Sequence, residues 1–283
     1  MSEEYEIFYD VLNQRRVRLQ EIKHQLKESP ALLKLFDEKS WFNKVESQID
    51  IWEKNPELSI KERPIIIPEY VLFRYLAENA ILENFLKTFS LIDDIIDVTN
   101  TNQLNQWNST KPLFFSQNIS QIYSSIFEVL ILGKLISTKL KIDIYYENIE
   151  GRIWVDNRYI YFEAKSLQKN RHDLEGFGAA STEFDKNQIY RALKDKNGQL
   201  YPYRKAPTII FLSLYRLADG VTSKWYINEY YLEPESELNV NNKIISGVKL
   251  YEWFTAQGKG AFYVNPNAIN NLTENELTFF NSL

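Results

Sequence analysis

The five residues from Tyr161 to Lys165 contain the pair of side chains best suited to chemistry. Side chains of a β-strand alternate between its two faces, so we expect Glu163 and Lys165 to share one face. A carboxylate can hold a divalent cation, and a neighbouring ammonium can position water or stabilise negative charge that develops during a reaction. The same spacing occurs at Glu21 and Lys23, in a segment with a helical pattern. The spacing alone is therefore a weak signal, and its surroundings decide its meaning.

A second carboxylate is expected close to Glu163. Asp156 and Asn157 lie between two β-rich runs and predict a two-residue hairpin turn, which places Glu150 opposite Glu163. Directly opposed side chains lie about 5 Å apart, and two like charges there need either water or a cation between them. Asp143, at the start of the preceding predicted strand, is the other candidate. The partner acid is thus either Glu150 or Asp143.

Glu128 is a third acid of interest. It interrupts the apolar run from Ile126 to Leu132, where an ionised carboxylate is costly unless it is paired or metal-bound. The alternative is a helix residue that faces solvent or a lysine.

The first part of the chain, residues 1–113, is expected to be a helical domain. Apolar residues recur at helical spacing over 6–26, and a second strongly apolar helix is predicted over 69–91, with Pro68 in its first turn. Residues 98–113 are rich in Asn, Thr and Gln and resemble a connector.

The second part, residues 114–283, is expected to be an α/β domain, with a mixed α+β sheet flanked by helices. A helix is predicted over 120–139 and another over 185–195. Strands are predicted over 141–147, 152–155, 159–165, 208–215, 224–232 and 261–264.

Composition excludes several classes of site. The chain has no Cys, which rules out disulfides, thiol nucleophiles and thiolate metal sites, and its two His residues cannot form a His-rich zinc centre. No apolar run is long enough to span a membrane, and the acidic N-terminus does not resemble a signal peptide. We therefore expect a cytoplasmic protein that has no membrane partner.

The predicted order of helix, strand, hairpin ending in Glu163 and Lys165, helix and apolar strand resembles the core of the PD-(D/E)xK nuclease superfamily. The resemblance covers about residues 120–215 and implies a restriction-endonuclease-like fold and Mg²⁺- or Mn²⁺-dependent cleavage of DNA, as in a restriction system. It implies that Glu163 is a metal ligand, together with either Glu150 or Asp143, and that Lys165 is the catalytic lysine. Glu128 corresponds to the helix acid of many members, and Gln188 resembles a helix glutamine that follows the motif in some branches. The first half of the motif departs from the family, because Trp154 stands where related branches have Asp.

Charge favours a polyanionic partner on one face only. The net charge is −5, but residues 158–205 contain ten Lys or Arg against six Asp or Glu. Such a segment can steer a polyanion to one face. The candidate DNA contacts are Lys169, Arg171, Gln188 and Arg191. A homodimer is one option for assembly.

Two alternatives remain open. One is a catalytically inactive nuclease-fold module that binds nucleic acid or a protein partner. The other is an unrelated α/β interaction domain in which the Glu-x-Lys hairpin is structural.

Overall fold

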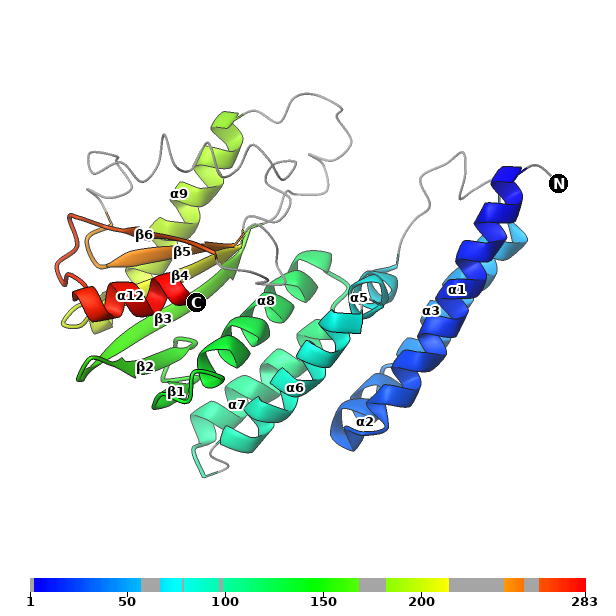
Figure 1. Cartoon of the computed structure of the whole chain (residues 1–283), viewed down its shortest axis with the longest axis horizontal. Helices are drawn as coiled ribbons and strands as arrows, with labels where there is room; N and C mark the ends of the chain where they lie inside the picture. The colour runs from blue at the N-terminus through cyan, green and yellow to red at the C-terminus, as the bar shows by residue number, and fades with distance from the viewer. Residues whose placement is uncertain are drawn as a thin grey trace. The chain divides into compact units, whose positions relative to one another are not determined.

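The computed structural model is a mixed α/β structure (Figure 1). It describes residues 3–56, 67–77, 79–96, 99–167, 182–213, 242–251 and 260–283. The strand predicted over 224–232 lies outside these residues. Among the described residues, no helix has the length and apolar character needed to cross a membrane.

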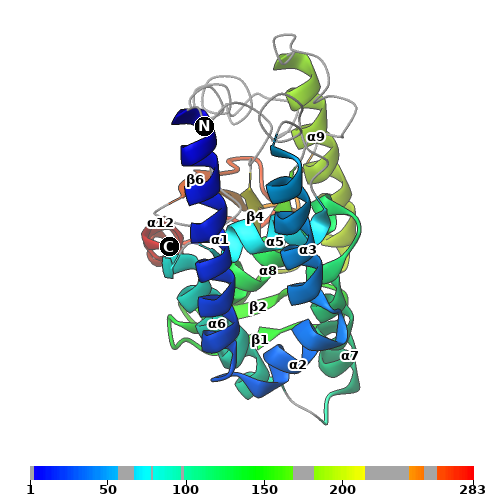
Figure 2. The same ribbon diagram turned by 90° about the vertical axis from the view of Figure 1, so that its right-hand side faces the viewer.

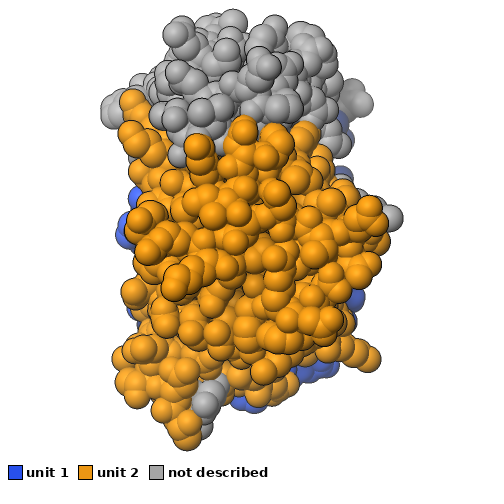
Figure 3. Space-filling view, turned by 90° about the vertical axis from the view of Figure 1, so that its left-hand side faces the viewer, with its two compact units in different colours: residues 1–90, 111–122 blue, residues 91–110, 123–283 orange. Residues whose placement is uncertain are grey.

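The chain divides into two compact units, coloured separately in Figure 3. One consists of residues 1–90 and 111–122, and the other of residues 91–110 and 123–283. The domain boundary expected between residues 113 and 114 stays a prediction.

The N-terminal helices pack as an antiparallel pair, α1 (Glu3–Leu26) and α3 (Trp41–Lys54), with α2 (Pro30–Glu38) between them in sequence (Figure 2). Arg16 of α1 binds Asp50 of α3 at 2.6 Å, whereas Lys23, further along α1, lies 5.2 Å from the ring of Phe42. Residues later in α1 thus contact residues earlier in α3, so the two helices run in opposite directions. The helix predicted over 6–26 is confirmed.

The second unit is built on a six-stranded sheet with the strand order β1-β2-β3-β4-β5-β6. Neighbouring strands pair antiparallel except for β3–β4 and β4–β5, which pair parallel. The strands are β1 (Ile142–Ile144), β2 (Gly151–Val155), β3 (Arg158–Ser166), β4 (Thr208–Ser213), β5 (Gly247–Tyr251) and β6 (Ala261–Val264).

The β2–β3 hairpin has the predicted turn and register. Asp156 and Asn157 have φ values of 48° and 67°, the left-handed conformation that a two-residue type I′ turn requires at both positions. Pairing of Gly151 with Phe162 shows that this register continues up to the residue before Glu163. The hairpin prediction is confirmed.

Helices cover both faces of the sheet. On one face, Ala192 and Leu193 of α9 (Thr182–Gln199) join a buried cluster that contains Ile210 and Leu212 of β4. On the other face, Phe211 of β4 packs against α12 (Glu274–Ser282), and Phe127 of α8 (Ile119–Ile136) contacts Tyr251. Glu163 pairs with Ile210, so its side chain lies on the α9 face.

Two predictions about helices were wrong. The segment predicted as one helix over 69–91 contains α5 (Pro68–Leu76) and α6 (Asn79–Ile95). The expected connector forms α7 (Thr101–Thr110), followed by the short 3₁₀ helix η1 (Lys111–Phe115). The polar composition of this segment predicted a connector, but the tertiary contacts of the buried Trp107 stabilise a helix instead. Trp107 donates a hydrogen bond to Asp93 at 2.6 Å and stacks on Tyr145.

Candidate active site

Glu163 is completely buried on β3, yet it is held entirely by polar groups. Lys196 of α9 donates a hydrogen bond to its Oε2, and Gln199 donates a hydrogen bond to its Oε1 at 2.6 Å. Gln199 also donates to the carbonyl of Asn148 at 2.8 Å, which ties the end of α9 to the loop before β2. A carboxylate held this way has a fixed position, because both of its oxygens are engaged by groups that are themselves anchored.

Two further acids lie next to Glu163. We call Glu128, Glu150 and Glu163 the acidic cluster. Glu150 approaches Glu163 within hydrogen-bonding reach, and Glu128 interacts electrostatically with Glu150. Oε2 of Glu150 is buried without a hydrogen-bond partner among the described residues. A buried carboxylate oxygen in that state is available to a proton or a cation.

The cluster strongly perturbs the protonation of its members. Burial, and then the neighbouring Glu150, raise the pKa of Glu163 to about 10, although Lys196 opposes the shift. Burial and Glu150 likewise raise the pKa of Glu128 to about 8. Burial alone would lower the pKa of Lys196, but the surrounding carboxylates outweigh it and raise that pKa. The ammonium therefore stays charged, and the cluster holds protons at neutral pH.

Lys196 and Gln199 were not predicted as site residues. They are three residues apart and therefore lie on the same side of α9. The parallel pairing of β3 with β4 requires a crossover between these strands, and α9 provides it. The only sequence signal was a polar pair near the end of a helix that was expected to end earlier.

Lys165 lies on the same strand face as Glu163, two residues further along, and it is exposed. Its ammonium makes no ion pair with another described residue. Asp143 instead binds Nε of Arg152 at 2.6 Å, from the opposite position on β1. The structure thus brings Glu150, and not Asp143, into contact with Glu163.

The predicted nucleic-acid contacts are only partly described. Lys169 and Arg171 lie outside the described residues. Gln188 is on α9, but its side chain is not among those described, and Arg191 is exposed on the same helix. Their role stays a prediction.

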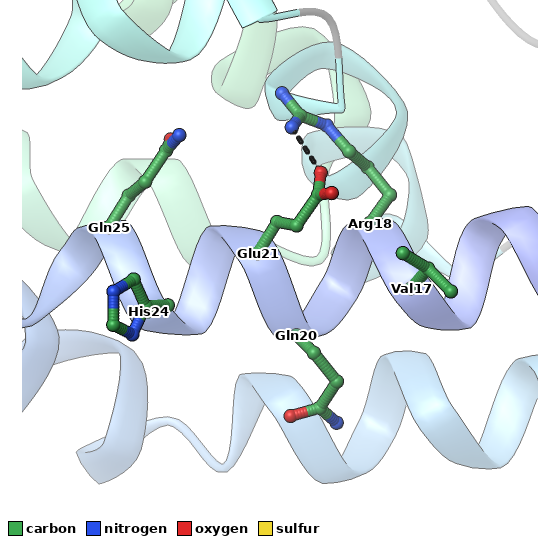
Figure 4. A pocket seen from close by; sticks show the side chains of 6 residues that line it. All are labelled: Val17, Arg18, Gln20, Glu21, His24 and Gln25. Atoms are coloured by element: carbon green, nitrogen blue, oxygen red, sulfur yellow. Dashed lines mark hydrogen bonds and ion pairs between the residues drawn. The ribbon is translucent and has the colours of Figure 1, made fainter.

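A separate shallow depression lies along α1 (Figure 4). Arg18 and Glu21 form an ion pair there at 2.6 Å. All of its lining residues come from this one helix: Val17, Arg18, Gln20, Glu21, His24 and Gln25. It offers no convergent group from a second element, so it is a weaker candidate than the acidic cluster.

The acidic cluster has the donor chemistry of a hard-cation site, because Mg²⁺ and Mn²⁺ bind carboxylate oxygens. Within the described ranges, no three acidic or histidine side chains are already arranged around a metal position. The ammonium of Lys196 provides the positive charge among the three carboxylates instead. No family model matches the sequence, and no curated protein and no solved structure matches the chain.

Proposed function

We propose that this chain is a cytoplasmic, metal-dependent endonuclease that hydrolyses phosphodiester bonds in DNA, with a restriction-endonuclease-like core. The observation that supports it most is the acidic cluster, in which carboxylates from α8, from the start of the hairpin and from β3 meet a buried lysine. Buried titratable groups with strongly shifted pKa values concentrate at functional sites.

The order of elements supports the same proposal. α8 is followed by three antiparallel strands, then by the crossover helix α9, and then by β4, which pairs parallel to β3. This is the order expected from the resemblance to the PD-(D/E)xK superfamily. One acid lies on the helix, one directly before the second strand and one on the third strand, while the first-half position of the motif holds Trp154.

The donor set fits a divalent cation, since Glu150 has a buried oxygen without a partner among the described residues and Glu163 lies beside it. Glu150 and Glu163 are the residues that would hold the ion. When bound, such an ion supplies a Lewis acid and lowers the pKa of a water molecule. Lys196 must leave Glu163 for both carboxylates to serve as ligands.

Three other residues would have roles that do not involve binding the metal ion. Glu128, on α8, lies close enough to Glu150 to interact with it electrostatically. Lys165 is exposed on the face that carries Glu163 and forms no ion pair within the described ranges, so its ammonium could stabilise negative charge on a phosphate. Gln199 holds Glu163 in place through its hydrogen bond.

Cleavage of a mixed DNA library in Mg²⁺ or Mn²⁺ tests the proposal. We expect wild-type protein to cut and EDTA to stop it. Glu163→Gln should abolish cleavage, because an amide is a poor ligand for a hard cation. Lys165→Ala should slow cleavage by about 10²- to 10³-fold with nearly unchanged DNA affinity. Lys194→Ala, an exposed lysine on α9, is the matched control and should cut like wild type.

One observation favours a second candidate, the inactive nuclease-fold module. Lys196 already neutralises the cluster without a metal, as a scaffold would require. This candidate predicts no cleavage in either metal, together with DNA binding that weakens steeply between 50 and 200 mM salt, a range over which several phosphate contacts cost orders of magnitude. Cleavage that depends on Glu163 would exclude it.

A further inference from the structure

Aromatic rings and a guanidinium group line one face of the hairpins formed by β1, β2 and β3. We call this set the stacking surface. Its members are Tyr146, Arg152, Trp154, Tyr159, Tyr161 and Tyr203. Cross-strand pairing places Arg152 opposite Tyr161 and Trp154 opposite Tyr159, so these four side chains point to the same side of the sheet.

The groups are linked by a series of ring–ring and guanidinium–ring contacts. Cζ of Arg152 lies 3.9 Å from the ring centre of Tyr146 and 4.0 Å from that of Tyr159. The ring of Trp154 meets Tyr159 edge-on at 4.8 Å. At the other end, Tyr161 stacks on Tyr203 at 4.7 Å, with 28° between the ring planes.

The stack is partly open to solvent. Tyr146, Tyr161 and Tyr203 pack with their inner edges on the buried cluster under α9, yet each keeps part of its surface exposed. Trp154 is 38% exposed, which is high for the largest apolar side chain. Partly exposed rings at such a density indicate a binding surface.

The surrounding charges favour an anionic partner. Lys141 lies 5.4 Å from the ring of Tyr159, and Asp143 fixes the orientation of Arg152. Arg204 and Lys205 follow Tyr203 directly, and both are exposed. Cations interleaved with flat rings suit a ligand that has both phosphates and π-faces.

We infer that the stacking surface binds single-stranded DNA, whose unpaired bases stack on its rings, and that the proposed nuclease therefore takes substrates with unpaired bases. Only the claim that these single strands are substrates rests on the proposed function; the claim that they bind does not. In a duplex the bases stack on one another and offer no free face, whereas every unpaired base offers one. Tyr161 is two residues from Glu163 on the same strand face, roughly 7 Å along the strand. A base stacked on Tyr161 therefore lies close along β3 to the residue that carries the acidic cluster.

Binding without metal separates this inference from catalysis. A fluorescein-labelled 20-nucleotide single strand and its duplex are titrated in EDTA and followed by fluorescence anisotropy. We expect wild-type protein to prefer the single strand. Trp154→Ala should weaken that binding by roughly 5- to 150-fold, the range for the loss of one base–aromatic stack. Trp154→Phe, which keeps a ring, should retain most of the affinity.

The control is Phe279→Ala, a half-exposed aromatic side chain of α12 on the other face of the sheet, which should bind like wild type. Thermal melting verifies that each variant is folded. Equal affinity for single strand and duplex, or unchanged binding by Trp154→Ala, would overturn the inference. Metal-dependent cleavage that Trp154→Ala leaves intact on single strands would also overturn it, while the nuclease proposal stands. Preference for single strands without any cleavage would support binding at the stacking surface and exclude the nuclease proposal.

Discussion

Replacing Glu163 by Gln in metal-free protein tests the electrostatics of the acidic cluster directly. Burial and Glu150 raise the pKa of Glu163 to about 10, so this carboxyl is protonated in the folded protein at neutral pH. It is ionised in the unfolded chain, where a glutamate has a pKa of about 4.3. Gln is uncharged and has the shape of the protonated acid: its oxygen can accept from Lys196, while its NH2 group replaces the oxygen that accepts from Gln199.

The sign of the effect follows from proton linkage. Between the unfolded pKa and about 10, the folded state binds one proton more than the unfolded state at this group. Its contribution to stability is complete below the unfolded pKa and is lost as the pH rises through that window. The loss is at most roughly 1.4 kcal/mol per pH unit, or ~4 kcal/mol between pH 6 and pH 9. Glu163→Gln has no titrating proton at this position, so its free energy of unfolding should lack this pH dependence.

Urea unfolding in EDTA at pH 6, 7.5 and 9 measures the difference. We expect the free energy of unfolding of wild type to fall more steeply with pH than that of Glu163→Gln, so the variant gains relative stability at pH 9. Asp195→Asn, an exposed acid beside Lys196 on α9, should follow wild type. Parallel pH profiles for wild type and Glu163→Gln would show that Glu163 is ionised in the folded protein and would refute this reasoning.

Three further variants test other parts of the structure. Lys196→Ala should tighten Mn²⁺ binding by more than tenfold in isothermal titration calorimetry, because it removes a positive charge from the cluster, whereas unchanged binding would place the metal elsewhere. Asn157→Ala should cost about 1–2 kcal/mol of unfolding free energy, owing to its φ of 67°, and Asn157→Gly should not; equal losses would show that the turn is not strained. Arg158→Met should cost about 3 kcal/mol, since it leaves Glu276 buried without the guanidinium that binds it at 2.6 Å, and Arg158→Lys should cost less. A cost below about 1 kcal/mol for Arg158→Met would mean that the fold does not depend on the Arg158–Glu276 ion pair.

The hairpin could be predicted because its information is local. Asp156 and Asn157 set the turn, and the turn sets the register that brings Glu150 close to Glu163. Residues within one hairpin need no knowledge of the rest of the fold. The choice between Glu150 and Asp143 depended on Arg152, which binds Asp143 across the neighbouring β1–β2 pair.

The other half of the site could not be predicted in this way. Lys196 and Gln199 approach Glu163 only because α9 crosses over the sheet between two parallel strands. Their position depends on where that helix ends and how it packs, and neither is encoded near Glu163. The same reason explains α7, where one buried tryptophan outweighs a run of polar residues.

Lys196 is central to both candidate functions, the metal-dependent nuclease and the inactive nuclease-fold module. Three carboxyl groups in a buried position require positive charge or protons, and the folded chain supplies both without a metal. The proposed divalent cation would bring twice the charge of an ammonium and accept more oxygen ligands, so its binding would require Lys196 to have another partner than Glu163. Lys196 is three residues from Gln199 and is already bonded to its side-chain oxygen at 3.1 Å. The lysine therefore has a second hydrogen-bond partner at hand, so a metal ion held by Glu150 and Glu163, as proposed, would not leave the ammonium without one.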